Sequence, residues 1–206
     1  VAAGEDGELG AAASRVEAAS VLRTAEGVEY YLEPVVPSPR LLVVGGGHCG
    51  QEIVFQAERL GFEVTVVDDR AEFVNPALFP AGVSLQSGNI REIVSAYPQD
   101  DETYIVLVSK GHRPDAEALE GCIHGGAKYI GMIGSKRKIR FLRKHFVEDG
   151  LATAEEFDRV VAPIGFDIGA VTVPEIGVSI AAQLVAARRL NSVEAKTKQL
   201  RPVAVR

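Results

Sequence analysis

The chain has 206 residues, of which 47% are hydrophobic and 24% are charged, and its formal net charge is −6. Such a composition is that of an ordinary globular protein with one dominant core, and nothing in it suggests disorder or repeats. The acidic balance argues against broad binding to nucleic acid or to an anionic membrane, because those partners favour a basic surface.

The first residues form a segment of their own. The opening stretch VAAGEDGELG is acidic where an export signal would be basic and then apolar. A helix-like piece and the short strand VEYYLEP follow, and the stiff connector PVVPSP closes the segment. We therefore expect an N-terminal segment over 1–38, a main domain over 39–192, and a C-terminal tail over 193–206 that frays.

Short apolar strands alternate with amphipathic helices through the main domain. The run LLVVG at 41–45 is typical of a central parallel strand that is buried on both faces. The next helix places Ile53, Ala57 and Leu60 on one side, and Gly61 ends it. Further strands are expected in FEVTVVDD, GVSLQSG, TYIVLVS and KYIGMIG.

Helices are expected between and after these strands. Two of them begin with a capping box, Thr153 with Glu156 and Thr172 with Glu175. The alternation predicts an α/β fold with a doubly wound, Rossmann-like parallel sheet, a short N-terminal appendage and C-terminal helices. The helical stretches are IREIVSAY, PDAEALEGCI, SKRKIRFLRKHF, TAEEFDRVV and EIGVSIAAQLVAARRL.

A glycine motif lies between the first strand of this domain and its helix. Gly45, Gly47 and Gly50 form G-x-G-x-x-G, and Asp68 ends the following strand. The first glycine permits a tight turn, the second lets a diphosphate approach the backbone, and the third lets the helix pack on the strand. The Asp68 carboxylate would accept hydrogen bonds from the ribose hydroxyls of NAD or NADP. The alternative is a turn of this shape that binds no ligand.

Neighbours of these residues leave several interpretations open. Asp68 and Asp69 point to opposite sides of the strand, so either carboxylate could face the ribose. Arg70 could receive a 2′-phosphate, although the acid before it would repel that group. His48 could touch a ligand phosphate, and Cys49 is either a small residue tolerated at a helix start or a thiolate whose pKa the helix lowers.

A second candidate anion site follows the last strand. Gly134 and Ser135 open a helix that starts with Lys136, and this turn lies at the same edge of the sheet as the glycine motif. It is not a Walker A loop, because G-x-x-x-x-G-K-[ST] does not occur. The alternative for the basic run, which continues with Arg137, Lys138 and Arg140, is a solvated helix face.

Two loops add further candidates. SKGHRPD places His112 and Asp115 just past a strand end, and APIGFDIGAVTVPE is a long loop of the kind that often carries function. Asp167 is either a ligand or an acceptor for backbone N–H groups, whereas Glu175 is explained by capping. Cys49 and Cys122 make neither a disulfide framework nor a metal-ligand spacing, so we expect no metal and a reducing, cytoplasmic setting.

Five motifs together resemble the C-terminal Rossmann-like domain of the XdhC/CoxI family, the xanthine dehydrogenase accessory proteins. The motifs are LLVVGGGHCG, GFEVTVVDDRAEF, SKGHRPD, YIGMIGSKRK and APIGFDIGAVTVPEI. The resemblance covers Glu33 to Leu190. It implies binding of molybdenum cofactor (molybdopterin) and its delivery to an apoenzyme of the xanthine or carbon monoxide dehydrogenase type. It further implies a cysteine desulfurase as a second partner, a homo-oligomer, and residues 1–38 as the tail of the family's N-terminal domain.

Three functions therefore compete: a maturation factor for molybdenum hydroxylases without turnover of its own, an NAD(P)-dependent oxidoreductase, and a nucleotide-sensing regulatory module. No catalytic residue is identified for the second. The family resemblance carries over its motif positions but not their individual roles. These positions are Gly45, Gly47, His48, Gly50, Asp68, Asp69, Arg70, His112, Asp115, Gly134, Ser135, Lys136, Pro163, Gly165, Asp167 and Glu175.

Overall fold

The computed structural model describes residues 20–23, 27–32, 37–111 and 113–190. The chain divides into two compact units, Val1–Pro37 and Ser38–Arg206. The division falls inside the Pro-rich connector that ends the N-terminal segment.

The described part of the first unit is a β-hairpin. Strand β1 (Ser20–Arg23) pairs antiparallel with β2 (Glu29–Leu32), and Gly27 in the connection has φ +83°, a conformation that glycine adopts without strain. The sequence predicted β2 but not β1, because the four residues SVLR show no alternation of their own. The helix-like piece that was expected in this segment lies outside the described residues.

The second unit is built on a five-stranded parallel sheet of order β5-β4-β3-β6-β7, which confirms the predicted doubly wound fold. The chain runs outward from β3 through β4 to β5 and then returns to β6 beside β3. Ligands of such sheets bind where this reversal occurs, beyond the carboxyl ends of the strands. The strands are β3 (Arg40–Val44), β4 (Glu63–Asp68), β5 (Ser84–Ser87), β6 (Thr103–Leu107) and β7 (Tyr129–Met132).

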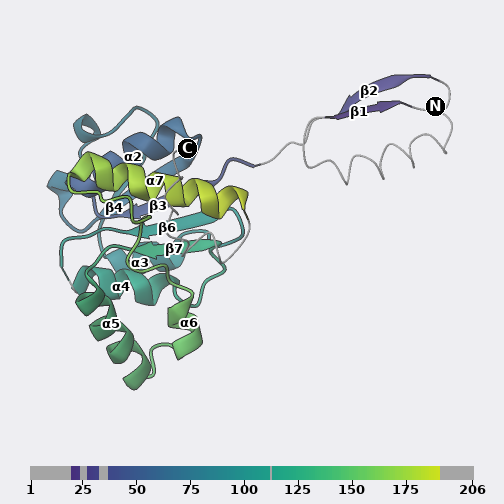
Figure 1. The fold of residues 1–206 in the computed structure, drawn as a ribbon. Coiled ribbons are helices and arrows are strands. Elements are labelled where there is room, and N and C mark those ends of the chain that lie inside the picture. Colours follow the sequence, from purple (N-terminus) through teal and green to yellow (C-terminus); the bar gives the residue numbers. More distant parts are fainter. Residues whose placement is uncertain (1–19, 24–26, 33–36, 112, 191–206) are drawn as a thin grey trace, which may run out of the picture. The chain divides into compact units, whose positions relative to one another are not determined.

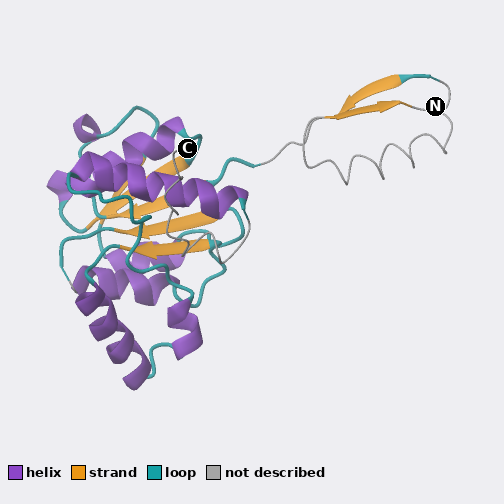
Figure 2. Cartoon of the chain, viewed as in Figure 1, coloured by secondary structure: helices purple, strands orange, loops and turns teal. Residues whose placement is uncertain are grey.

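Helices cover both faces of the sheet (Figures 1 and 2). Helices α2 and α7 pack over Leu41 and Val43, while α3, α4 and α5 pack over Leu42 and Val44, so alternate residues of β3 enter two separate core clusters. The continuous apolar run of β3 is thus explained by burial on both faces. The helices are α2 (His48–Arg59), α3 (Ile90–Ala96), α4 (Arg113–Cys122), α5 (Lys136–Glu148), α6 (Ala154–Asp158) and α7 (Val173–Arg189).

Both predicted capping boxes are present. The Thr153 and Thr172 hydroxyls accept from the backbone N–H of Glu156 and Glu175, whose carboxylates accept from the threonine backbones in return. Two short 3₁₀ turns between β4 and β5, η1 (Ala71–Phe73) and η2 (Pro76–Leu78), were not predicted. Within the described residues, none of the helices is long and apolar enough to cross a membrane.

Candidate functional site

Loops from the ends of β3, β6 and β7 meet where the strand order reverses. The Ile133 N–H donates to the Leu107 carbonyl at 2.9 Å, which joins the ends of β6 and β7. A Cβ atom built on Gly45 would lie 2.8 Å from the Ser109 backbone nitrogen, and Gly45 has φ +117°. Only glycine therefore fits the first position of the motif, where two loops touch. We call this edge of the sheet the crevice, after the place at which sheets of this kind bind ligands, and define it by Gly45–Gly47, Ser109–Gly111 and Gly134–Lys136.

Packing requires two of the three motif glycines, Gly45 and Gly50, and leaves space at Gly47. A Cβ on Gly50 would lie 1.8 Å from the Gly45 carbonyl oxygen, so this residue allows α2 to pack on its own strand loop. A Cβ on Gly47 would meet no atom within 4 Å. Gly47 is the N-cap of α2, and its position gives no side-chain cap to the first helical N–H groups. The second glycine thus leaves open space beside uncapped donors, as an approaching anion requires.

His48 and Cys49 occupy the first turn of α2. His48 is exposed, so its imidazole is accessible to a ligand at the crevice. Burial raises the pKa of the half-buried Cys49 thiol. This direction favours the neutral thiol and the interpretation of Cys49 as a small residue at a helix start, over the interpretation as a reactive thiolate.

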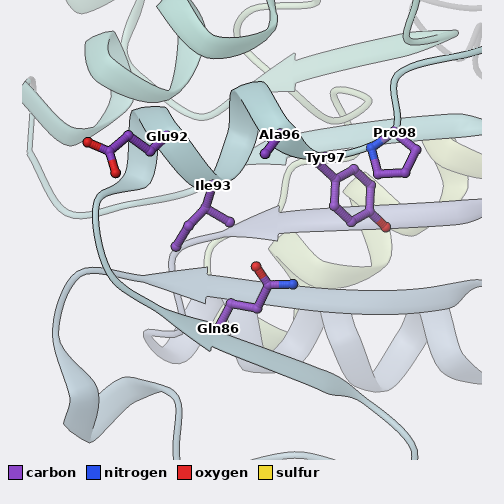
Figure 3. Close-up of a pocket in the computed structure, with 6 residues that line it drawn as sticks. All are labelled: Gln86, Glu92, Ile93, Ala96, Tyr97 and Pro98. Carbon is purple, nitrogen blue, oxygen red and sulfur yellow. The ribbon is translucent and has the colours of Figure 1, made fainter.

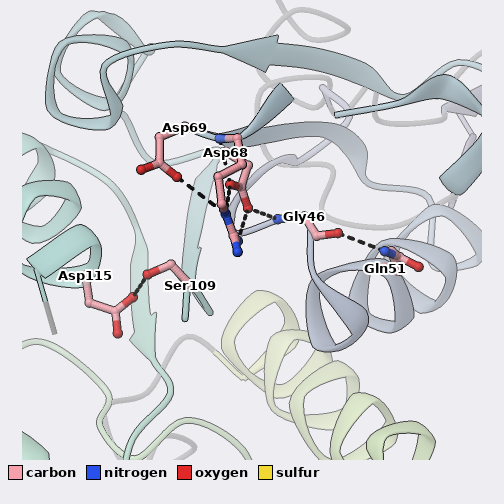
Figure 4. A network of polar contacts seen from close by, with 7 residues as sticks. Gly46, Gln51, Asp68, Asp69, Ser109 and Asp115 are labelled. Carbon is pink, nitrogen blue, oxygen red and sulfur yellow. Dashed lines mark hydrogen bonds and ion pairs between the residues drawn. The ribbon is translucent and has the colours of Figure 1, made fainter. Parts of the chain in front are cut away.

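The Asp68 carboxylate is buried and fully engaged inside the protein (Figure 4). Its Oδ2 accepts from the Gly46 N–H at 2.9 Å and from Arg70 Nη2 at 3.0 Å. Its Oδ1 accepts from the Arg70 N–H at 3.0 Å and from Arg70 Nε at 2.9 Å. Although burial opposes it, bonding to Arg70 and Gly46 lowers the pKa of Asp68. Asp68 therefore ties the glycine loop to the end of β4.

Arg70 and Asp69 lie beside this carboxylate. The Arg70 guanidinium stacks over the Phe73 ring at 4.0 Å, and its hydrogen bonds to Asp68 raise its pKa. Asp69 is about half exposed, with its carboxylate 3.7 Å from Arg70 Nε. Of the two acids at the strand end, Asp68 faces the glycine loop and Asp69 faces solvent, so the structure answers the question of orientation that the sequence left open.

The second anion site lies at the start of α5. Ser135 is the N-cap, and its hydroxyl accepts from the Lys138 N–H at 3.2 Å. Lys136 and Arg137 are exposed, and neither side chain makes a hydrogen bond or ion pair with any other described residue. Gly134 is half-buried against the Lys138 side chain. The charges of Lys136 and Arg137 remain available to an anion at the crevice.

A buried polar network joins the loops of the crevice. Asp115 is fully buried at the start of α4 and accepts from the Ser109 hydroxyl, as Figure 4 shows, and from the Lys138 ammonium. Lys138 Nζ also donates to the carbonyls of Gly111 at 3.2 Å and Ile133 at 3.4 Å. Lys138 thereby clamps the β6 loop to the β7 loop.

Sequence reasoning did not assign a role to Lys138 or Ser109. Lys138 stood within a basic run that suggested one solvated face, yet the side chain turns inward because its position faces Leu142 and Phe146, the buried side of α5. The sequence did contain a signal that Lys138 lies on the buried side of α5. Lys138 is three residues after the N-cap and four residues before Leu142, so the two side chains lie on one side of the helix.

The long loop before α7 is fastened by residues that the sequence did not single out. The Gln183 side chain accepts from the Gly165 N–H at 2.8 Å and from the Tyr129 hydroxyl at 2.7 Å. The Ser179 hydroxyl donates to the Phe166 carbonyl at 2.6 Å. Asp167 is exposed without a hydrogen bond to another described residue, so the backbone-acceptor role considered for it falls to Gln183.

The remaining candidates are placed as follows. Glu175 serves the cap of α7, as predicted. Pro163 is exposed and follows a cis peptide bond, and Gly165 has φ +95° beside the Ser179 hydroxyl. His112 lies outside the described residues. No group of three or more His, Cys, Asp or Glu side chains in the described part of the chain could hold a metal ion.

A shallow pocket of about 420 Å³ opens on β5 and α3 (Figure 3). It is lined by Gln86, Glu92, Ile93, Ala96, Tyr97 and Pro98. None of the predicted site residues lines it, and Glu92 is its one charged residue. The pocket therefore offers no anion site, and the crevice remains the candidate site.

Comparison with known protein families identifies one match over most of the main domain. The model of the XdhC Rossmann domain matches residues 41–184. This range contains the glycine motif, both acids after β4, and the basic turn at the start of α5.

The curated proteins similar to the chain include one from Escherichia coli and one from Bacillus subtilis. The uncharacterized protein YqeB of Escherichia coli (strain K12) is 32% identical over 147 residues, covering 71% of this chain and 27% of YqeB. A protein of Bacillus subtilis (strain 168), described as a probable xanthine dehydrogenase subunit, is 24% identical over 163 residues, covering 79% of this chain and 47% of that protein. The chain thus spans less than half the length of either relative.

A solved structure shares the fold. The crystal structure described as a xanthine dehydrogenase from Bacillus halodurans superimposes with a TM-score of 0.67 at 23% identity. The match covers 80% of this chain and 46% of that one.

Proposed function

The chain belongs to the family of the XdhC Rossmann domain, and from this premise we propose that it is an accessory protein for the maturation of a molybdenum hydroxylase of the xanthine or carbon monoxide dehydrogenase type. In this role it holds or delivers the molybdenum cofactor in the cytoplasm. Its partners are the hydroxylase apoenzyme and a cysteine desulfurase, and it acts as a homo-oligomer. The name of its Bacillus subtilis relative, which refers to xanthine dehydrogenase, supports the link to this enzyme class.

Two features at the carboxyl edge of the sheet support the proposal: the open N-terminus of α2, and cations at the start of α5 that are unpaired among the described residues. Gly47 leaves space at the N-terminus of α2, whose N–H groups and dipole favour an anion. Lys136 and Arg137 add positive charge at the start of α5. Residues of this kind would hold the anionic end of a cofactor, and they would position it while contributing no reaction chemistry.

The site fits a phosphate better than it fits a dinucleotide held by its ribose. The acid that would accept the ribose hydroxyls, Asp68, already has four donors on its two oxygens. This use of the Asp68 carboxylate inside the protein favours binding and delivery over the alternative of an NAD(P)-dependent oxidoreductase. The sensing alternative would share the anion site but need no hydroxylase.

The proposal predicts that Lys136→Glu lowers the activity of the partner hydroxylase without unfolding the accessory protein. The exposed Lys136 contributes little to the fold, whereas reversal of its charge would repel an anion held at the crevice. We expect hydroxylase activity to fall about 10-fold, the loss of one charge-assisted contact. The measurement is specific activity of the hydroxylase purified from cells in which the variant replaces the wild-type protein.

Lys144→Glu is the matched control. Lys144 lies two turns further along α5 and is also exposed, so its reversal changes the net charge equally but away from the crevice. It should leave hydroxylase activity within about twofold of wild type, which corresponds to less than about 0.5 kcal/mol. Equal losses for both variants would show a general effect of charge and would count against an anion site at the crevice.

A further inference from the structure

We infer that the Arg70 guanidinium takes the hydrogen-bond positions on Asp68 that a ribose diol would otherwise use. The crevice therefore selects its ligand by its phosphate and not by its sugar. The inference rests on the proposed function, since it concerns the ligand of the same glycine loop. It deepens that function by naming the class of ligand: a phosphate ester whose ribose, if it has one, makes no contact with Asp68.

The first observation is the complete use of the Asp68 carboxylate. An ionised carboxylate has about four lone-pair sites. The Gly46 N–H, the Arg70 N–H and two guanidinium N–H groups of Arg70 take all four, at 2.9–3.0 Å. Asp68 is only 1% exposed, so a ribose hydroxyl could reach it only after the guanidinium had left.

The second observation is that the Arg70 side chain is held from both sides. Its guanidinium lies between the Asp68 carboxylate and the Phe73 ring, which is 4.0 Å away. The Phe73 backbone in turn closes on the glycine loop, because a Cβ on Gly46 would come within 2.1 Å of the Phe73 carbonyl oxygen. In a Rossmann site the ribose lies between the glycine loop and the acid after the second strand. Here the Arg70 guanidinium is bonded to that acid, and the Phe73 carbonyl lies against the glycine loop.

The third observation is the contrast at the other end of the loop. Gly47 faces open space, and the cations at the start of α5 are unpaired among the described residues. The acid that would bind a sugar is thus already engaged, whereas the backbone at Gly47, where a phosphate would bind, faces open space. Ligand affinity should therefore depend on the phosphate and should not change when the ribose hydroxyls are removed.

Calorimetry with ADP and 2′,3′-dideoxy-ADP tests this in the wild-type chain. The two ligands carry the same diphosphate and base. They differ only in the 2′- and 3′-hydroxyls, which would donate hydrogen bonds to Asp68. We expect their affinities to agree within about twofold, since no charge-assisted bond is at stake. Binding of ADP at least about 10-fold tighter than the dideoxy analogue would show that the diol reaches an acid and would overturn the inference.

Arg70→Ala should create the preference that the wild type lacks. The variant frees two lone-pair sites on Asp68, so ADP should bind about 10- to 100-fold tighter than dideoxy-ADP. Adding Asp68→Asn should abolish this preference by removing the charged acceptor. Arg143→Ala is the control, because it breaks another Arg–Asp pair, with Asp158 at 2.7 and 2.9 Å, that lies on α5 and α6. A folded Arg70→Ala protein without the preference would contradict the inference.

The outcomes separate this inference from the proposed function. If the wild type binds neither nucleotide, the Arg70→Ala variant decides: new binding of ADP supports the inference, and no binding by either protein overturns it. Thermal denaturation of each variant shows whether it is folded. The role in hydroxylase maturation is tested by the Lys136→Glu variant and its effect on hydroxylase activity, which does not depend on the ribose.

Discussion

Lys138→Ala is expected to lower the free energy of unfolding by about 3–5 kcal/mol, the usual cost of removing one partner of a buried ion pair. The variant leaves the Asp115 carboxylate fully buried without its cation. It also deprives the carbonyls of Gly111 and Ile133 of a donor, so the loops after β6 and β7 lose their clamp. Urea denaturation followed by circular dichroism would measure the change.

Two comparisons make this result specific. Lys136→Ala removes a lysine from the same turn of α5, but one that is exposed and unpaired among the described residues, so it should change stability by less than about 0.5 kcal/mol. Lys138→Met combined with Asp115→Asn removes both charges and should recover much of the loss. Equal stability of Lys138→Ala and Lys136→Ala would show that the buried pair contributes nothing.

Gly50→Ala is expected to lower the free energy of unfolding by about 3 kcal/mol, at the upper end of the range for overpacked sites. The added Cβ would lie 1.8 Å from the Gly45 carbonyl oxygen, and a backbone atom cannot turn away as a flexible side chain can. Helix α2 must shift from its strand, which outweighs the gain of about 1 kcal/mol that alanine brings to a helix. Thermal and urea denaturation would report the loss.

Gly47→Ala is the matched control. Its Cβ would meet no atom within 4 Å, and its φ of −70° suits alanine. The fold should therefore keep its stability within about 0.5 kcal/mol, while the new methyl group stands where the phosphate would approach. If Gly47→Ala unfolded the protein as Gly50→Ala does, the division of roles within the glycine motif would be wrong.

The framework of the main domain could be predicted because each element has a pattern of its own. The apolar run of β3, the 3.6-residue spacing of Ile53 and Ala57, and the capping residues Thr153 and Thr172 all appear in the structure as expected. Hairpin strand β1 was missed, because four residues are too few to show periodicity.

Contacts within the site could be predicted only in part. The sequence located the glycine loop, the acids after β4 and the turn at Ser135, because each follows a strand end. It could not tell that Arg70 turns back onto Asp68, since this depends on the 3₁₀ turn at Ala71–Phe73. The spacing of Lys138 from Leu142 could have separated it from Lys136, but the basic run suggested one solvated face.

The roles of individual residues toward a ligand stay predictions. The ribose contact of Asp68 or Asp69 and the phosphate contacts of His48, Arg70 and Lys136 were proposed from motif order alone. The structure places these residues at or just after the ends of β3, β4 and β7, and it assigns Asp68 four internal donors.

The molybdenum content of the partner hydroxylase tests the central claim most directly. The enzyme would be purified from a strain without this accessory protein and from the same strain complemented with it, and molybdenum per polypeptide would be measured together with activity. We predict a folded hydroxylase that is poorly active because its cofactor is missing or unsulfurated, with both defects restored by complementation. A hydroxylase with full activity and full cofactor content in the deletion strain would contradict the account.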